Sequence, residues 1–213
     1  MKQPLAAKRK SEVQKKKQRV IALAGNPNVG KSTLFNQLTG LHQHTGNWAG
    51  KTVAHAKGVA EYNERSYLFV DLPGTYSLFA HSGEEEVARD FICFGAPDAV
   101  LLVCDATCLA RNLNLVLQTL EITRRVVVCV NLLDEAKRKG IVLDLEKLSL
   151  VLGVPVVGCT AKKKKTLLPL FDALEKVIET PPKEVFLPKY PQKVEDGIEK
   201  IEQMLPLCEK LGG

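Results

Sequence analysis

The sequence predicts an α/β fold in which helices cover both faces of an open, mostly parallel sheet. Short apolar segments alternate along the chain with segments of helical periodicity, as strands do when right-handed helical crossovers join them. The apolar segments are nearly continuous in hydrophobic residues, which is typical of parallel strands buried on both faces. A glycine-rich loop of the phosphate-binding type links the first apolar segment to the first helical one.

The individual elements follow from these patterns in chain order. The predicted strands are the apolar segments 19–24, 66–71, 98–104, 125–131 and 154–158. The predicted helices, with apolar residues at steps of three and four, are 32–38, 84–94, 111–123, 144–152 and 166–179. Residues 55–62 are expected to add an antiparallel edge strand beside 66–71.

The last part of the chain has a different pattern. Pro181 and Pro182 end the alternation of strands and helices. Apolar residues from Val194 to Cys208 then recur at steps of three and four, which predicts a short C-terminal helical extension. Because the chain stops soon afterwards, at Gly213, we expect it to be a piece of a longer protein.

The positive charge of the chain lies in its first residues. Residues 1–19 hold eight Lys and Arg residues and one glutamate, a balance of +7, whereas the whole chain carries +6. The remaining residues therefore carry −1. Such a basic tail can contact lipid phosphates or nucleic acid, or it can remain a solvated flexible arm.

Composition excludes several classes of protein. The tail lacks the apolar core of a secretory signal, and no uninterrupted apolar stretch approaches the 18 or so residues of a membrane span. The six cysteines form no C-x-x-C pair, and Cys104 and Cys129 lie inside apolar segments. This usage indicates a reduced cytosolic setting rather than a disulfide framework or a zinc site.

Residues 25–33 fit G-x-x-x-x-G-K-[ST], the motif that wraps nucleotide phosphates. Its glycines let successive N–H groups point at an anion, and the following helix adds the positive end of its dipole. Lys31 can reach the β- and γ-phosphates, and the Ser32 hydroxyl can bind Mg²⁺. An ordinary glycine-rich turn is the alternative, but the strand before the loop and the helix after it disfavour that view. The predicted nucleotide-binding residues here are Gly25, Asn26, Pro27, Asn28, Val29, Gly30, Lys31, Ser32 and Thr33.

Two further segments are expected at the γ-phosphate. Asp71-Leu72-Pro73-Gly74 ends a predicted strand as a D-x-x-G element, so that Asp71 can hold Mg²⁺ through a water and the Gly74 N–H can bind the γ-phosphate. The same sequence is also a common turn, but its place behind a phosphate loop favours the functional interpretation.

The polar segment with Gly50, Lys51 and Thr52 is the expected switch, in which Thr52 binds Mg²⁺ and the γ-phosphate and is released after hydrolysis. We therefore expect Ser32, Thr52 and, through water, Asp71 to hold Mg²⁺.

Guanine rather than adenine is the predicted base. Asn131-Leu132-Leu133-Asp134 matches the N-x-x-D core of guanine recognition, and the Asp134 carboxylate can accept both N–H bonds of the guanine edge. Leu132 replaces the usual lysine, whose aliphatic stem covers the base. Cys159-Thr160-Ala161 follows the last strand, where a backbone N–H is expected to meet the guanine O6 atom.

These motifs together resemble one family. Gly46-Asn47-Trp48-Ala49-Gly50-Lys51-Thr52-Val53 is similar to the G-N-W-P-G-x-T-V switch of the FeoB ferrous-iron transporters. The phosphate loop, Asp71–Leu78, Glu86–Asp90 and the leucine at 132 fit the same family, so the likeness spans about residues 19–180.

The resemblance implies a Ras-like P-loop GTPase fold and a GTP-hydrolysing switch domain that gates Fe²⁺ transport. It divides the chain into a basic flexible tail (1–18), a G domain (19–180), and a linker with the start of a helical regulatory domain (181–213).

The resemblance also implies cofactors and catalytic residues. GTP or GDP, Mg²⁺ and K⁺ are the implied ligands. Asn28 matches the asparagine of potassium-activated GTPases and would hold K⁺ with backbone carbonyls of Gly46, Asn47 and Trp48. Asn28 can alternatively bond only within its own loop. The implied catalytic residues are Lys31, Asn28, Thr52 and Gly74, whereas Thr75 stands where Ras-like proteins place a water-orienting glutamine.

The implied partners belong to a membrane system. They are the transmembrane iron-permease domain of the same full-length protein and a small accessory Feo protein, with oligomers formed through the membrane part. The implied location is the cytoplasmic face of the bacterial inner membrane, and no nucleic acid is expected.

The sequence departs from the family at four places, one of which is its long basic tail. Ala49 stands where the family tends to have a proline, and Lys51 stands where it often has a valine. Residues Lys162–Lys165 replace the glycines that usually follow the guanine loop. The last of these changes puts the conformation of that loop in question.

Other functions stay open at this point. One is a soluble GTPase that acts on RNA or ribosomes through the basic tail, although the rest of the chain is not basic. Another is a non-catalytic module that senses guanine nucleotide. Iron binding by His42 and His44 is disfavoured, because two exposed histidines lack a third ligand.

Overall fold

The computed structural model of the chain describes residues 18–40, 43–48, 53–79 and 82–204. Seven strands and seven α-helices lie in these ranges, with one 3₁₀ turn at Lys164–Thr166. The strands are β1 (Arg19–Gly25), β2 (Gln43–Asn47), β3 (Ala54–Tyr62), β4 (Arg65–Asp71), β5 (Ala99–Asp105), β6 (Val126–Asn131) and β7 (Val156–Gly158). The helices are α1 (Lys31–Thr39), α2 (Gly83–Phe94), α3 (Leu109–Ile122), α4 (Leu133–Arg138), α5 (Leu145–Leu152), α6 (Leu168–Glu179) and α7 (Gln192–Met204).

All seven strands join one sheet in the order β2-β3-β4-β1-β5-β6-β7. The strands from β4 to β7 pair in parallel, while β2 and β3 add an antiparallel edge. The predicted α/β class with a mostly parallel sheet is therefore confirmed, including the antiparallel strand beside β4. Strand β1 lies between β4 and β5, so the strand order reverses at β1. Open α/β sheets bind ligands at the carboxyl end of the strands at such a point, which here is the loop after β1.

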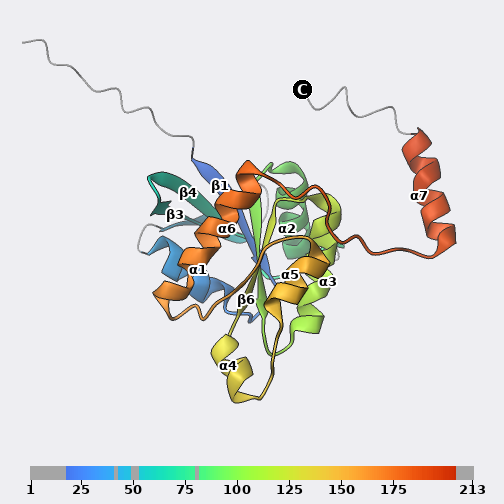
Figure 1. The fold of residues 1–213 in the computed structure, drawn as a ribbon. Helices are drawn as coiled ribbons and strands as arrows, with labels where there is room; N and C mark the ends of the chain where they lie inside the picture. Colours follow the sequence, from blue (N-terminus) through green and yellow to red (C-terminus); the bar gives the residue numbers. More distant parts are fainter. Residues whose placement is uncertain (1–17, 41–42, 49–52, 80–81, 205–213) are drawn as a thin grey trace, which may run out of the picture.

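Helices cover both faces of the sheet, and a separate core lies under each face (Figure 1). Strand β1 shows the division, because Ile21 and Leu23 belong to one core while Ala22 and Ala24 belong to the other. The first core packs under α1 and α6, and the second under α2, α3 and α5. Strands buried on both faces explain why β5 and β6 are almost uninterrupted in apolar residues.

Two elements differ from the sequence-based expectation. Strand β2 was not among the predicted strands, but its backbone pairs with β3, and Thr45 lies opposite Ala56. Helix α4 was not expected, because its six residues are too few to show amphipathic periodicity. Both elements are held by their neighbours rather than by their own hydrophobic pattern.

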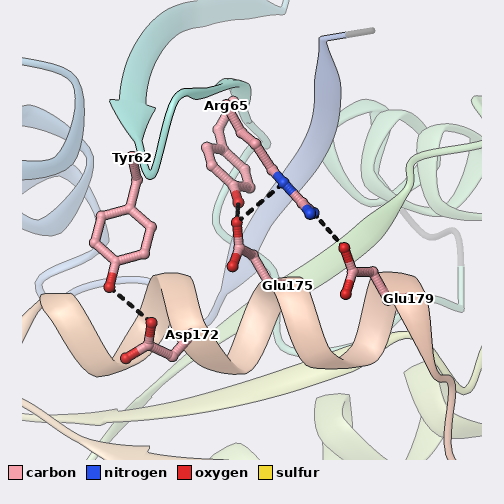
Figure 2. A network of polar contacts seen from close by, with 6 residues as sticks. Tyr62, Arg65, Asp172, Glu175 and Glu179 are labelled. Carbon is pink, nitrogen blue, oxygen red and sulfur yellow. Dashed lines mark hydrogen bonds and ion pairs between the residues drawn. The ribbon is translucent and has the colours of Figure 1, made fainter. Parts of the chain in front are cut away.

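The hairpin of β3 and β4 is fastened to α6 by the polar network in Figure 2. The Tyr62 hydroxyl donates to Asp172 at 2.7 Å, and Arg65 forms ion pairs with Glu175 and Glu179. The fully buried Tyr67 also donates its hydroxyl proton to Glu175, at 2.7 Å. These contacts tie the sheet edge that bears β2 to the helix that leads toward the C-terminal segment.

Helix α7 lies away from the sheet and its covering helices (Figure 1). The helix predicted from Val194 onward is present, and the predicted positions Leu205 and Cys208 fall outside the described residues. In the segment before α7, Tyr190 bonds through its hydroxyl to Glu121 of α3, at 2.6 Å. Within the described ranges, no helix is both long and apolar enough to cross a bilayer.

Candidate functional site

The phosphate loop connects β1 to α1 and borders an open cleft of about 500 Å³. Asn28 and Gly30 take the left-handed conformation, with φ of 66° and 80°, and turn the backbone into the helix. The Gly30 carbonyl accepts the first helical bond, from Leu34 N at 3.0 Å. The cleft is lined by Asn26, Pro27, Asn28, Gly30, Lys31, Ser32, Thr33, Gly74 and Glu84. Seven of the nine motif residues and Gly74 therefore border one cleft.

Both motif glycines are required by close contacts. A Cβ atom on Gly25 would lie 2.6 Å from the Val103 carbonyl oxygen. A Cβ atom on Gly30 would lie 2.4 Å from Nδ2 of Asn131, and its positive φ disfavours a side chain in any case. The phosphate loop therefore packs directly on the side chain that begins the guanine motif.

Lys31 is paired with Asp71, one of the residues expected to hold Mg²⁺. Its ammonium group forms an ion pair with the Asp71 carboxylate and donates to the Leu72 carbonyl at 2.7 Å. Burial raises the pKa of Asp71 above its ordinary value, and the charge and hydrogen bond of Lys31 act against that rise. The predicted phosphate ligand Lys31 and the predicted Mg²⁺ ligand Asp71 therefore lie in direct contact.

The segment after Asp71 also rests on the phosphate loop. The Thr75 N–H donates to the Gly25 carbonyl at 3.2 Å, and a Cβ atom on Gly74 would lie 3.3 Å from Pro27. Thr75 is 2% exposed, and its hydroxyl donates to the Ser77 carbonyl at 2.6 Å. Since this hydroxyl is used inside its own turn, Thr75 is poorly placed to orient a water at the phosphates.

Asn131 joins three parts of the site. Its fully buried side chain donates through Nδ2 to the Val29 carbonyl at 3.0 Å. Its Oδ1 accepts the Ala161 N–H at 3.0 Å and lies 3.5 Å from the Cys159 thiol. Of the segment Cys159–Ala161, in which a backbone N–H is expected to meet guanine O6, the Ala161 N–H is thus bound to Asn131 in this structure. Asp134, in the first turn of α4, is exposed, so its carboxylate is open to a base.

Two features of the guanine loop were missed from the sequence. Leu132 adopts a left-handed conformation with φ of 63°, which turns the chain from β6 into α4. Thr166 holds the loop closed, because its hydroxyl donates to the Thr160 carbonyl at 3.0 Å and accepts from the Thr160 N–H at 3.2 Å. This threonine gives the loop a defined shape although Lys162–Lys165 lacks glycines. A hydroxyl residue just after the loop was the available signal.

The cysteines near this loop are buried thiols. The sulfur atoms of Cys129 and Cys159 lie 3.1 Å apart, and neither side chain is more than 1% exposed. The hydrogen bond to Cys159, followed by burial, raises the pKa of Cys129, and burial raises the pKa of Cys104 to about 12. Thiols with such pKa values stay protonated and pack as small apolar groups.

The oxygen donors present suit the two predicted cations. Ser32 is exposed at the start of α1 and lines the cleft, and Asp71 is paired with the neighbouring Lys31. Hydroxyl and carboxylate oxygens are ligands that Mg²⁺ prefers. Asn28 is exposed, so its amide oxygen is available to a cation.

The two switch segments are only partly described. Gly46 and Asn47 belong to β2, and the Trp48 ring packs edge-on against Phe91 of α2 with centroids 5.3 Å apart. None of these three residues is among those lining the described cleft, so the predicted potassium ligands are not gathered here. Gly50, Lys51, Thr52 and His42 lie outside the described residues. Within the ranges that the structure covers, His, Cys, Asp and Glu side chains form no group of three that could hold a metal ion.

Comparisons with known proteins agree on one family. A family model described as ferrous iron transport protein B matches residues 19–174. A relative from Porphyromonas gingivalis, a fusion of Fe(2+) transport protein A and the Fe(2+) transporter FeoB, is 40% identical over 181 residues. That match covers 82% of this chain and 21% of the relative, so the chain spans about a fifth of the relative's length.

Solved structures of similar chains include both empty and nucleotide-bound forms. The apo cytosolic domain of the Thermotoga maritima FeoB iron transporter has a TM-score of 0.84 and 38% identity, covering 89% of this chain and 75% of that one. The GMPPNP form of the same domain has a TM-score of 0.83 and 38% identity, covering 88% of this chain and 74% of that one. At this identity the likeness extends to sequence as well as to fold.

Proposed function

The chain belongs to the ferrous iron transport protein B family, and we propose that it is the GTP-hydrolysing switch domain of a ferrous-iron transporter. The observation that supports this best is the Asn131 side chain, which fastens the phosphate loop to the guanine loop while Asp134 stays open to a base. GMPPNP is held by the similar cytosolic domain from T. maritima. In this chain the cleft beside the phosphate loop would hold the nucleotide phosphates.

Triphosphate binding would exchange the partners of Lys31. Its ammonium group now neutralises Asp71, and it would turn to the β- and γ-phosphates, whose non-bridging oxygens carry more negative charge than one carboxylate. Asp71 would then be released to hold a metal-bound water, and the Gly74 N–H would bind the γ-phosphate. The proposed catalytic residues are Lys31, Asn28, Thr52 and Gly74, which act by positioning and charge rather than by covalent chemistry.

Two cations complete the proposed site. Mg²⁺ would be held by Ser32, Thr52 and, through water, Asp71; K⁺ would be held by Asn28 and the carbonyls of Gly46, Asn47 and Trp48. When bound, these ions neutralise charge that develops on the phosphate oxygens. Thr75, at the position of the water-orienting glutamine of Ras-like proteins, uses its hydroxyl in its own turn, so the proposed K⁺ would be needed for fast turnover. Without K⁺, turnover should be ~10⁻⁴ to ~10⁻² s⁻¹.

The remainder of the proposal concerns the whole protein. Residues 19–180 would form the G domain after a basic tail at 1–18, and residues 181–213 would be a linker and the start of a helical regulatory domain. The membrane permease would lie in the longer protein, since the chain spans only about a fifth of its P. gingivalis relative. An accessory Feo protein is a further proposed partner, and that relative contains transport protein A in the same chain. The domain would work at the cytoplasmic face of the bacterial inner membrane.

Base selection tests this function. Asp134→Asn replaces the acceptor of the two guanine N–H bonds by an amide, and should weaken GDP binding by at least about a hundredfold. The same variant should gain affinity for xanthosine diphosphate, whose base offers an oxygen where guanine has its amino group. Calorimetric titration of the wild type and the variant with both nucleotides and with ADP measures this. Equal affinity of the wild type for ADP and GDP would contradict the proposal.

A further inference from the structure

Asn26 is a buried polar residue without a visible partner. The residue is 2% exposed, and within the described structure neither Nδ2 nor Oδ1 has a hydrogen-bond partner. Asn112 and Asn131 are buried to the same degree, and both of them are hydrogen-bonded. Because an unpaired buried amide is costly, an asparagine that stands alone in the folded chain indicates a partner that arrives in another state.

The neighbours of Asn26 show where that partner lies. Gly25 accepts the Thr75 N–H through its carbonyl at 3.2 Å. Pro27 packs on Gly74 so closely that an added Cβ there would lie 3.3 Å from the Pro27 Cα and N atoms. Residues on both sides of Asn26 thus touch Gly74 and Thr75. Asn26 and Gly74 also line the same cleft.

The chain segment opposite Asn26 has a second set of contacts. We call residues 72–78 the D-x-x-G segment. At its far end, Gln118 of α3 accepts the Leu78 N–H at 2.7 Å and lies 3.2 Å from the Ser77 hydroxyl. Its near end is held by the Lys31 bond to the Leu72 carbonyl. Since Lys31 would leave that carbonyl when it binds phosphates, the near end would lose a partner at the moment a γ-phosphate arrives.

We propose that Asn26 is a positioning residue that binds the backbone of the D-x-x-G segment in the triphosphate state. An asparagine side chain offers one acceptor and two donors, which match the N–H and C=O groups of a peptide unit. The bond would hold the Gly74 N–H toward the γ-phosphate and replace the contact that Lys31 gives up. This inference rests on the proposed GTPase function and adds to it a residue that distinguishes triphosphate from diphosphate.

The test compares Asn26→Ala with Asn112→Ala, the same substitution at an equally buried asparagine whose partners are present. Without nucleotide, Asn26→Ala should leave the thermal midpoint unchanged or raise it, whereas Asn112→Ala should lower it. In titrations, Asn26→Ala should bind GDP within about twofold of the wild type. It should bind GMPPNP about tenfold more weakly, which is the change in dissociation constant expected from the loss of one hydrogen bond. Asn26→Ser, which keeps a hydroxyl, should recover part of the loss.

Three results would overturn the inference. Equal weakening of GDP and GMPPNP would make Asn26 a plain phosphate-loop contact. Unchanged affinity of Asn26→Ala for both nucleotides would show that Asn26 does not position the D-x-x-G segment. A lower thermal midpoint of the nucleotide-free variant would show that its amide already has a partner in that state. Failure of the wild type to bind either guanine nucleotide would instead reject the proposed function, and the inference with it. Because the proposed bond holds the Gly74 N–H toward the γ-phosphate, the turnover of saturating GTP should also be lower in Asn26→Ala than in the wild type.

Discussion

The Oδ1 atom of Asn131 accepts the backbone N–H of Ala161 at 3.0 Å, while the other end of the same amide donates to the phosphate loop. One side chain therefore sets the distance between the loop that would bind phosphates and the loop that would bind the base. Because Asn131 is fully buried, water cannot replace it. The geometry of the nucleotide site thus depends on a residue that need not touch the nucleotide.

Removing that amide should cost stability as well as binding. Asn131→Ala leaves the Val29 carbonyl and the Ala161 N–H without partners in the interior, which should lower the free energy of unfolding by about 2–4 kcal/mol. Urea unfolding of the nucleotide-free protein measures it. Asn114→Ala is the control, because its amide makes one exposed bond, to the Tyr76 carbonyl. Similar losses in the two variants would refute the bridging role.

Gly30 should tolerate no side chain. Gly30→Ala places Cβ against Nδ2 of Asn131 and adds left-handed strain, so the fold should lose more than about 2 kcal/mol and nucleotide binding should disappear. Gly140→Ala is the matched control, because Gly140 has φ of 71° and nothing lies within 4 Å of an added Cβ. It should lose only about 1 kcal/mol of backbone strain. Unfolding curves of both variants decide the matter, and equal losses would assign the effect to φ alone.

In the network of Figure 2, the hydrogen bond from Tyr67 to Glu175 should contribute most to the free energy of unfolding. Glu175→Ala deprives the buried Tyr67 hydroxyl of its acceptor and should cost about 1–3 kcal/mol in urea unfolding. Glu179→Ala removes an ion pair from the more exposed Arg65 and should have an effect too small to resolve. A larger loss for Glu179→Ala than for Glu175→Ala would contradict this order.

Thiol labelling should separate the cysteines by burial and by pH. Iodoacetamide should modify the exposed Cys93 and spare Cys104 and Cys129 until the protein unfolds. Burial raises the pKa of Cys93. Its labelling rate should therefore rise with pH through a midpoint above that of a free cysteine peptide, as more thiolate forms. Peptide mass mapping between pH 7 and 10 measures each site. Labelling of Cys104 in the folded protein, where burial raises its pKa to about 12, would contradict the packing.

Most strands could be predicted from the sequence because burial on both faces leaves a continuous apolar run, as in β6. Strand β2 could not, because Gln43–Asn47 is polar and its conformation comes from pairing with β3. The motif glycines and Lys31 were identifiable because phosphate binding restricts residue type at fixed spacing. The contact of Lys31 with Asp71 and the closure of the guanine loop by Thr166 were not, since they join residues whose separation no motif specifies.

The proposed function is tested most directly by GTP hydrolysis of this chain in KCl and in NaCl at equal ionic strength, with ATP as the control nucleotide. We expect Mg²⁺-dependent turnover of GTP that is clearly faster in KCl, loss of that stimulation in Asn28→Ala, and no comparable hydrolysis of ATP. Equal rates in the two salts would contradict the role of Asn28 as a potassium ligand. Equal hydrolysis of ATP and GTP, or none of GTP in either salt, would contradict the account as a whole.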